Sequence, residues 1–168
     1  MIERVGAVIA FERVKVPHTN EAWFVRDASG RVWVRKRESE MGPEGLLAEV
    51  VGWHVGRALG VSVPDAAISE GPEGRAWLSR MVPNASHWAG QAALAFSGLD
   101  QLARIHLLDT LIANEARHMR NLLVEGAELR AIDQEEALVG HVADFVARDL
   151  RAPSPHNLAR GLPKVPQA

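Results

Sequence analysis

Two short apolar runs, residues 122–124 and 129–132, flank the polar segment Glu125–Glu128, and this pattern constrains the chain more than any other. Apolar runs separated by a short turn that contains glycine are typical of a β-hairpin. Pairing of the two runs across the turn brings Asn121 and Asp133 together at the open end of the hairpin. An amide oxygen beside a carboxylate suits a hard cation whose other ligands are phosphate oxygens. The same residue types also serve as a cap and a solvated strand end, so both interpretations stay open.

The first 37 residues predict strands. Apolar or alternating runs of strand length cover Val5–Phe11, Ala22–Arg26 and Arg31–Arg37. The segment Asp27–Gly30 is a favourable hairpin turn between the last two. Because strand side chains alternate, Lys36 lies on the same face as Val32 and Val34, and we expect both valines to be buried.

The middle of the chain mixes helix and strand. Residues 44–59 predict a helix with little polar face, which we expect to be well buried. Strands are predicted at Ala66–Ile68 and Ala76–Val82, and a linker over Pro83–Gly90. A second helix is predicted over residues 91–114, because apolar residues recur there with a helical period: Leu99, Leu102, Ile105, Leu108, Leu111 and Ile112.

Composition excludes several classes of function. The chain has no cysteine, which rules out disulfides, thiolate catalysis and cysteine-based zinc sites and fits a reducing cytoplasm. The formal net charge of -2 gives no reason to expect binding to nucleic acid or to a membrane. No stretch approaches the roughly 20 apolar residues of a transmembrane helix, and the N-terminus lacks the pattern of a signal peptide. We therefore expect a cytoplasmic protein, and its tyrosine-free, alanine- and arginine-rich composition suggests a bacterial one.

The order of the predicted parts is that of a protein-kinase-like phosphotransferase. Residues 109–133 read DTLIANEARHMRNLLVEGAELRAID. This segment resembles the D-x-x-I-x-N-x-D-R-H-x-x-N-L-L stretch, hairpin and A-I-D of HipA-like and phosphatidylinositol-kinase-like kinases. The matching positions are Asp109, Ile112, Asn114, Arg117, His118, Asn121, Leu122, Leu123, Ile132 and Asp133. A weaker similarity extends over most of residues 20–137.

The resemblance implies an α+β, protein-kinase-like fold with two lobes. Residues 1–83 are expected to form the N-terminal lobe, a small sheet with one helix. Residues 84–168 are expected to form a reduced helical C-terminal lobe that carries the hairpin, with both lobes packed as a single compact unit.

The resemblance also implies an ATP site. Lys36 is expected to hold the α- and β-phosphates, and Glu49 is expected to aim it from the helix. Met81 and Val82 lie in the expected hinge, where backbone groups would hydrogen-bond adenine. Lys36 is flanked by two arginines, so an ordinary charged strand end with Glu49 in solvent is the alternative.

A magnesium site and a loop follow from the same resemblance. Asn121 and Asp133 are expected to bind Mg²⁺. Arg117 and His118 match loop residues of the family that organise the loop without acting as nucleophile or base.

The chain departs from the family at the position of the catalytic aspartate, where Ala116 stands. Alanine cannot accept the proton of a substrate hydroxyl, and the adjacent Glu115 is the one candidate to replace it. The strand turn expected over the phosphates, His18–Glu21, contains no glycine. Gln134 stands where a histidine often follows the metal aspartate, and only 35 residues follow Asp133, so the C-terminal lobe is expected to be short.

The sequence therefore predicts a degenerate kinase that binds ATP and Mg²⁺ without efficient phosphoryl transfer and acts through an unidentified protein partner. One alternative is a small working kinase that phosphorylates a protein hydroxyl or a small molecule with Glu115. The other is a structural protein that binds no nucleotide, in which Lys36, Glu49, Asn121 and Asp133 are remnants.

Overall fold

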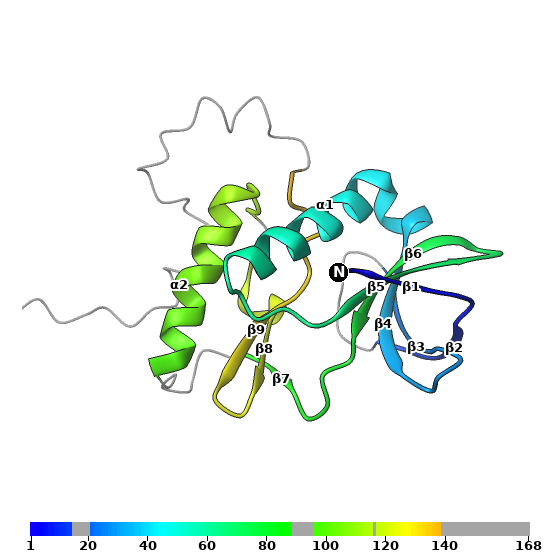
Figure 1. Cartoon of the computed structure of the whole chain (residues 1–168), viewed down its shortest axis with the longest axis horizontal. Coiled ribbons are helices and arrows are strands. Elements are labelled where there is room, and N and C mark those ends of the chain that lie inside the picture. The colour runs from blue at the N-terminus through cyan, green and yellow to red at the C-terminus, as the bar shows by residue number, and fades with distance from the viewer. Residues whose placement is uncertain (15–20, 89–95, 116, 139–168) are drawn as a thin grey trace, which may run out of the picture.

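The computed structural model describes residues 1–14, 21–88, 96–115 and 117–138 (Figure 1). These residues form an α+β structure with a large sheet, a small sheet and two α-helices. The large sheet has the strand order β1-β5-β6-β4-β3-β2, in which β1 and β5 are parallel and all other neighbours are antiparallel. Its strands are β1 (Glu3–Val5), β2 (Ile9–Arg13), β3 (Ala22–Arg26), β4 (Val32–Arg37), β5 (Ala66–Gly71) and β6 (Gly74–Arg80).

The single strand expected over Val5–Phe11 is wrong, because this segment belongs to two strands at opposite edges of the sheet. Val5 and Val8 pack against a buried cluster that includes Trp33. Ile9 and Phe11 of the same run are exposed, so its apolar residues do not share one buried strand face.

The first helix, α1 (Glu38–Ala58), begins earlier than the expected residue 44. Gly42 interrupts it with a φ of 76°, and Pro43 follows. A positive φ is accessible to glycine, and proline has no N–H to donate, so both residues favour a kink there. The main part of α1 covers the sheet face that carries Lys36, and its buried residues include Glu49.

The hairpin expected near the C-terminal end is confirmed, with Val124 paired to Leu129. Its strands β8 (Leu122–Glu125) and β9 (Glu128–Ala131) follow a short 3-10 helix, Met119–Asn121. A further strand, β7 (Ser86–His87), pairs with β8. The segment predicted as a linker therefore contains an element of the small sheet.

The second helix, α2 (Phe96–Leu111), ends before the expected residue 114. Ala113, just beyond its end, has a φ of 50°, which cannot continue a right-handed helix. Its periodic apolar residues do not all face the core. Leu102, Ile105 and Leu108 are buried, as is Ile112 just beyond the helix, whereas Leu99 and Leu111 are about half exposed.

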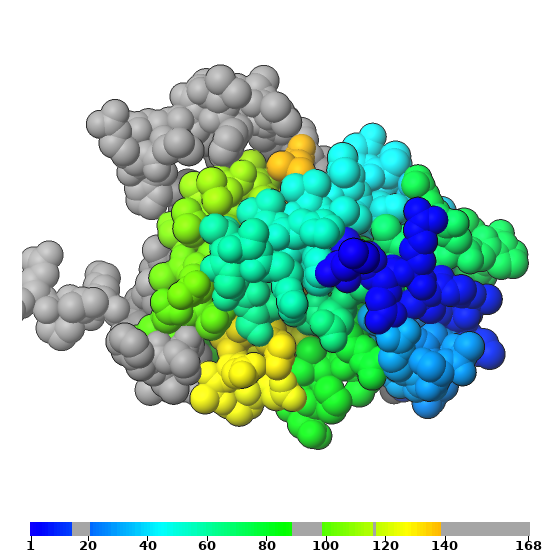
Figure 2. All heavy atoms as spheres, viewed as in Figure 1, coloured from blue at the N-terminus to red at the C-terminus, as the bar shows by residue number. Residues whose placement is uncertain are grey.

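The main core lies between α1, α2, the small sheet and the inner face of the large sheet. On the face shown in Figure 2, α1 runs between α2 and the N-terminal strands. This arrangement places the end of β9 near the middle of α1, since Gly52 and Gln134 are in contact distance of each other. Neither described helix has the length and hydropathy needed to span a bilayer.

Candidate functional site

Lys36 is buried on the inner face of the large sheet. Trp33 occupies the opposite face of β4, where it is buried in the cluster against which Val5 and Val8 pack. Val34 lies on the lysine's side and lines a cavity. The expectation that Val32 and Val34 are both buried is wrong, because both are half-buried. The face assigned to Lys36 by strand alternation therefore opens toward α1.

The structure brings Lys36 and Glu49 together. Lys36 Nζ lies 2.9 Å from Glu49 Oε1, and the Glu49 side chain is 1% exposed. The second carboxylate oxygen of Glu49 accepts a hydrogen bond from the backbone N–H of Gln134 at 3.2 Å. Glu49 thus connects the sheet lysine to the segment after β9.

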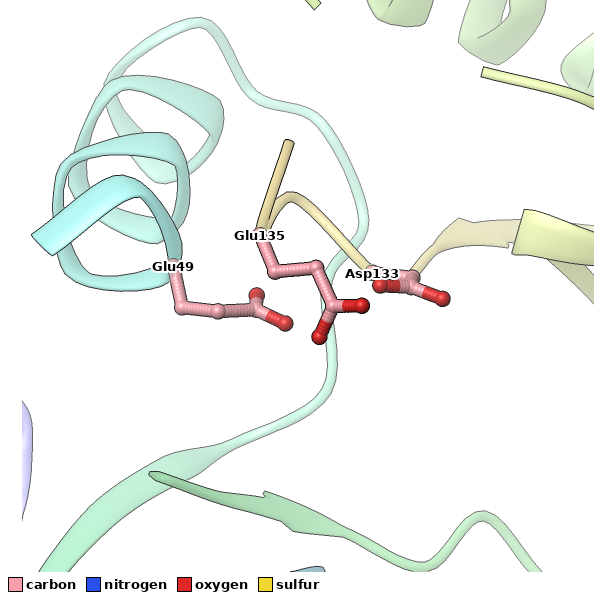
Figure 3. A group of neighbouring side chains, drawn as sticks. All are labelled: Glu49, Asp133 and Glu135. Carbon is pink, nitrogen blue, oxygen red and sulfur yellow. The ribbon is translucent and has the colours of Figure 1, made fainter. Parts of the chain in front are cut away.

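Two more carboxylates from that segment surround the same ammonium group (Figure 3). Lys36 Nζ lies 2.5 Å from Asp133 Oδ1 and 2.8 Å from Glu135 Oε2. Figure 3 shows the three carboxyl groups turned toward a common region, Glu49 from α1 and the other two from the chain after β9. One lysine is consequently enclosed by three acidic groups.

The charges of this cluster shift the pKa values of its members. Burial opposes the charge on Lys36, but Glu49, Asp133 and Glu135 outweigh it and raise the lysine pKa above its ordinary value. Burial also raises the pKa of Glu49, and the Lys36 charge opposes this rise. With all four groups ionised, the cluster carries two more negative charges than positive ones.

This donor set fits a divalent cation. Oxygen atoms of Glu49, Asp133 and Glu135 lie within 4.8 Å of one another. Mg²⁺ prefers carboxylate and phosphate oxygens, and its charge would balance the excess of the cluster. Glu135 could not be singled out from the sequence, because nothing local shows that it, and not its neighbour Glu136, turns toward Lys36.

Asn121 is buried, and a backbone hydrogen bond links it to the segment after β9. Its carbonyl oxygen accepts a hydrogen bond from the N–H of Ile132 at 3.0 Å, one residue before Asp133. The two residues assigned to a cation by the hairpin register are therefore adjacent in the fold.

Arg117 ties the loop before the small sheet to α2. Its guanidinium lies 3.0 Å from Asp109 Oδ1 and also donates to the carbonyl oxygens of Asn121 and Ile132. Both members of the ion pair are buried, and burial raises the pKa of Asp109 despite the opposing charge of Arg117. His118 contributes differently: its side chain is exposed, and its carbonyl oxygen accepts from the N–H of Asn121.

A cavity of about 190 Å³ opens beside Lys36. Its wall is mostly apolar and includes Lys36, Glu49 and Asp133 of the charged cluster as well as residues 79–82. The lining residues are Val14, Ala22, Phe24, Val34, Lys36, Glu49, Trp53, Val63, Pro64, Trp77, Ser79, Arg80, Met81, Val82, Ala85, His87, Leu123, Ala131, Ile132, Asp133 and Gln134. An apolar pocket with a few convergent polar groups is the usual form of a small-molecule site.

Of the remaining candidates, Gln134 is among the residues that line this cavity. Glu115 is half-buried and does not line it. Ala116 and the first three residues of the glycine-free turn His18–Glu21 lie outside the described residues. Gln134 is buried, and its side chain packs against Gly52 of α1.

Comparison with known proteins identifies the fold. No protein-family profile and no curated protein sequence matches the chain. The fold is similar to that in the crystal structure of the Helicobacter pylori proinflammatory kinase CtkA, with a TM-score of 0.55 and 14% identity. The similarity covers 80% of this chain, which spans 60% of the length of that kinase. The expectation of a kinase-like α+β fold is thereby confirmed.

Proposed function

We propose that this protein is a HipA-like kinase relative that binds ATP with Mg²⁺ and has lost efficient phosphoryl transfer. One observation carries the proposal: Lys36 contacts Glu49 at 2.9 Å and Asp133 at 2.5 Å in the wall of an apolar cavity. A sheet lysine paired with a helix glutamate, facing a metal-binding aspartate, is the arrangement with which kinases hold ATP phosphates.

The apolar part of the cavity wall suits an adenine ring. Met81 and Val82 line it together with apolar side chains from β3, β4 and β6. The N–H of Met81 donates to Val32 and the carbonyl oxygen of Val82 accepts from Ala85, so both groups are engaged within the chain. Adenine would therefore use either the Met81 carbonyl oxygen or the Val82 N–H, because these two groups belong to one trans peptide and point in opposite directions.

Asp133 and Asn121 are the residues that would hold Mg²⁺ in this proposal. A bound Mg²⁺ would neutralise phosphate charge and orient the phosphate chain. Arg117 supports the two residues indirectly, because it donates to the carbonyl oxygens of Asn121 and Ile132 and so fixes the backbone on either side of the hairpin opening.

Loss of transfer follows from the side chain at residue 116. A kinase loop uses an aspartate to accept or orient the proton of the substrate hydroxyl, and alanine has no group for this task. Glu115 does not line the cavity that contains Lys36. A nucleotide-binding protein without transfer would act through its shape, and we propose a protein partner whose binding depends on the nucleotide.

Isothermal titration with ATP in MgCl₂ tests the proposal. Wild type and Asp100→Asn, a change at an exposed residue of α2, should bind ATP alike, whereas Asp133→Asn should bind it at least about tenfold more weakly. Absence of binding in wild type would overturn the proposal and favour a structural protein.

An assay for transfer of the γ-phosphate separates the degenerate kinase from the working one. We expect no turnover above the background of Lys36→Met. Turnover in wild type that disappears in Glu115→Gln would instead establish the working kinase.

A further inference from the structure

Lys36 has more acidic partners than a phosphate-binding lysine needs. One helix carboxylate is enough to aim such a lysine, and Glu49 fills that role at 2.9 Å. Asp133 is the second partner, at the position assigned to the metal. Glu135 is the third, 2.8 Å from Nζ, and the assignment of Mg²⁺ to Asn121 and Asp133 gives it no role of its own.

The charge of Glu135 can act on Lys36 independently of the backbone around it. Its side chain is 7% exposed, so solvent screens its charge only weakly. The backbone around it is held by other contacts: the N–H of Gln134 donates to Glu49, and the N–H of Ala137 donates to the carbonyl oxygen of Gln134 at 2.9 Å. Removal of the Glu135 charge should therefore leave the segment in place.

The three carboxylates create an obstacle to nucleotide binding. A phosphate that approaches Lys36 must replace Asp133 and Glu135 as its partners and meets their negative charge at close range. A divalent cation removes both obstacles, because it takes up the displaced carboxylates and cancels the charge excess.

We propose that Glu135 is a competing counter-ion that keeps Lys36 from phosphate until a divalent cation binds, and thereby makes nucleotide binding dependent on the cation. The inference rests on the proposed function, since it concerns how the same site admits ATP. It assigns Glu135 a specificity role: free ATP is rejected, and the metal complex of ATP is accepted.

The test measures ATP affinity by isothermal titration in EDTA and in MgCl₂, and the quantity of interest is the ratio of the two dissociation constants. Wild type should bind much more weakly in EDTA. In Glu135→Gln the ratio should fall by about tenfold or more, mainly because binding in EDTA improves, as expected from removal of one buried charge next to the lysine. Glu136→Gln is the matched control, since Glu136 is exposed and one residue away, and it should keep the wild-type ratio.

The outcomes separate this inference from the function on which it rests. ATP binding in MgCl₂ with the same ratio in wild type, Glu135→Gln and Glu136→Gln would overturn the role of Glu135 and leave the proposed function standing. Equal wild-type affinities in EDTA and MgCl₂ would overturn it without any variant. Absence of ATP binding by wild type under both conditions would overturn the function and this inference together. Thermal melting of both variants, expected to match wild type, checks that the ratio reports on the site and not on the fold.

Discussion

Gly52 of α1 faces Gln134 so closely that a Cβ atom on the glycine would lie 2.8 Å from Cβ of Gln134. The contact fixes the distance between the helix that carries Glu49 and the segment that carries Asp133 and Glu135. A glycine at this position is therefore a requirement of the site and not only of helix packing.

Gly52→Ala should destabilise the protein by about 1–3 kcal/mol, because the added methyl group overlaps the backbone-attached atoms of Gln134. Urea unfolding measures this change. Gly56→Ala is the matched control on the same helix: its nearest contact would be a Leu108 methyl group at 3.3 Å, which can shift. The double variant Gly52→Ala/Gln134→Gly should show favourable coupling in a double-mutant cycle, and strict additivity would contradict the steric explanation.

Lys36→Met should destabilise the protein by about 3–5 kcal/mol at neutral pH, because it leaves three buried or half-buried carboxylates without their cation. The difference between variant and wild type should shrink as the pH falls, since protonation removes the unpaired charges. Unfolding midpoints at several pH values measure this trend. A difference that is independent of pH would show that Lys36 acts by packing alone.

Asp27 anchors the turn between β3 and β4, and its carboxylate accepts hydrogen bonds from Ser29, Arg31 and the Trp33 indole. Burial opposes its charge, but these donors outweigh burial and hold the pKa below its ordinary value. The stability it contributes is thus present above the unfolded-state pKa near 4 and is lost as the pH falls further. Asp27→Asn should cost about 1–3 kcal/mol at pH 7 and less at pH 2, measured by thermal unfolding. A cost that is as large at pH 2 as at pH 7 would contradict the charge-based account.

Arg117→Gln should destabilise the fold by about 3–5 kcal/mol, because it leaves Asp109 buried without its partner. The double variant with Asp109→Asn should recover part of this loss. Chemical unfolding of the two variants measures the coupling. Equal stability of the single variant and wild type would mean that the buried pair contributes nothing to the loop.

Much of this site could be predicted because its signals are local. The hairpin turn fixed the register that places Asn121 near Asp133, and strand alternation placed Lys36 on the inner face. Motif order then suggested Glu49 as a partner before any distance was known. Each of these inferences needed only a few neighbouring residues.

Other features depend on contacts between distant segments and were not predictable. The ion pair of Glu135 with Lys36 and the packing of Gln134 on Gly52 both join residues far apart in sequence. The division of the first apolar run into two edge strands likewise depends on burial of Val8 against Trp33. Leu99 and Leu111 follow the period of α2 but are exposed, because period alone does not determine how wide the buried face is.

The central claim, a nucleotide site at Lys36, is tested most directly by the melting temperature of the wild-type protein with ATP, with and without MgCl₂. A ligand at 100 times its dissociation constant stabilises a fold by about 2.7 kcal/mol, which raises the melting temperature by several degrees. We expect such a rise with ATP and MgCl₂ together, and a much smaller one with ATP in EDTA. No rise with millimolar ATP and MgCl₂ would contradict the account and leave a kinase-like fold that binds no nucleotide.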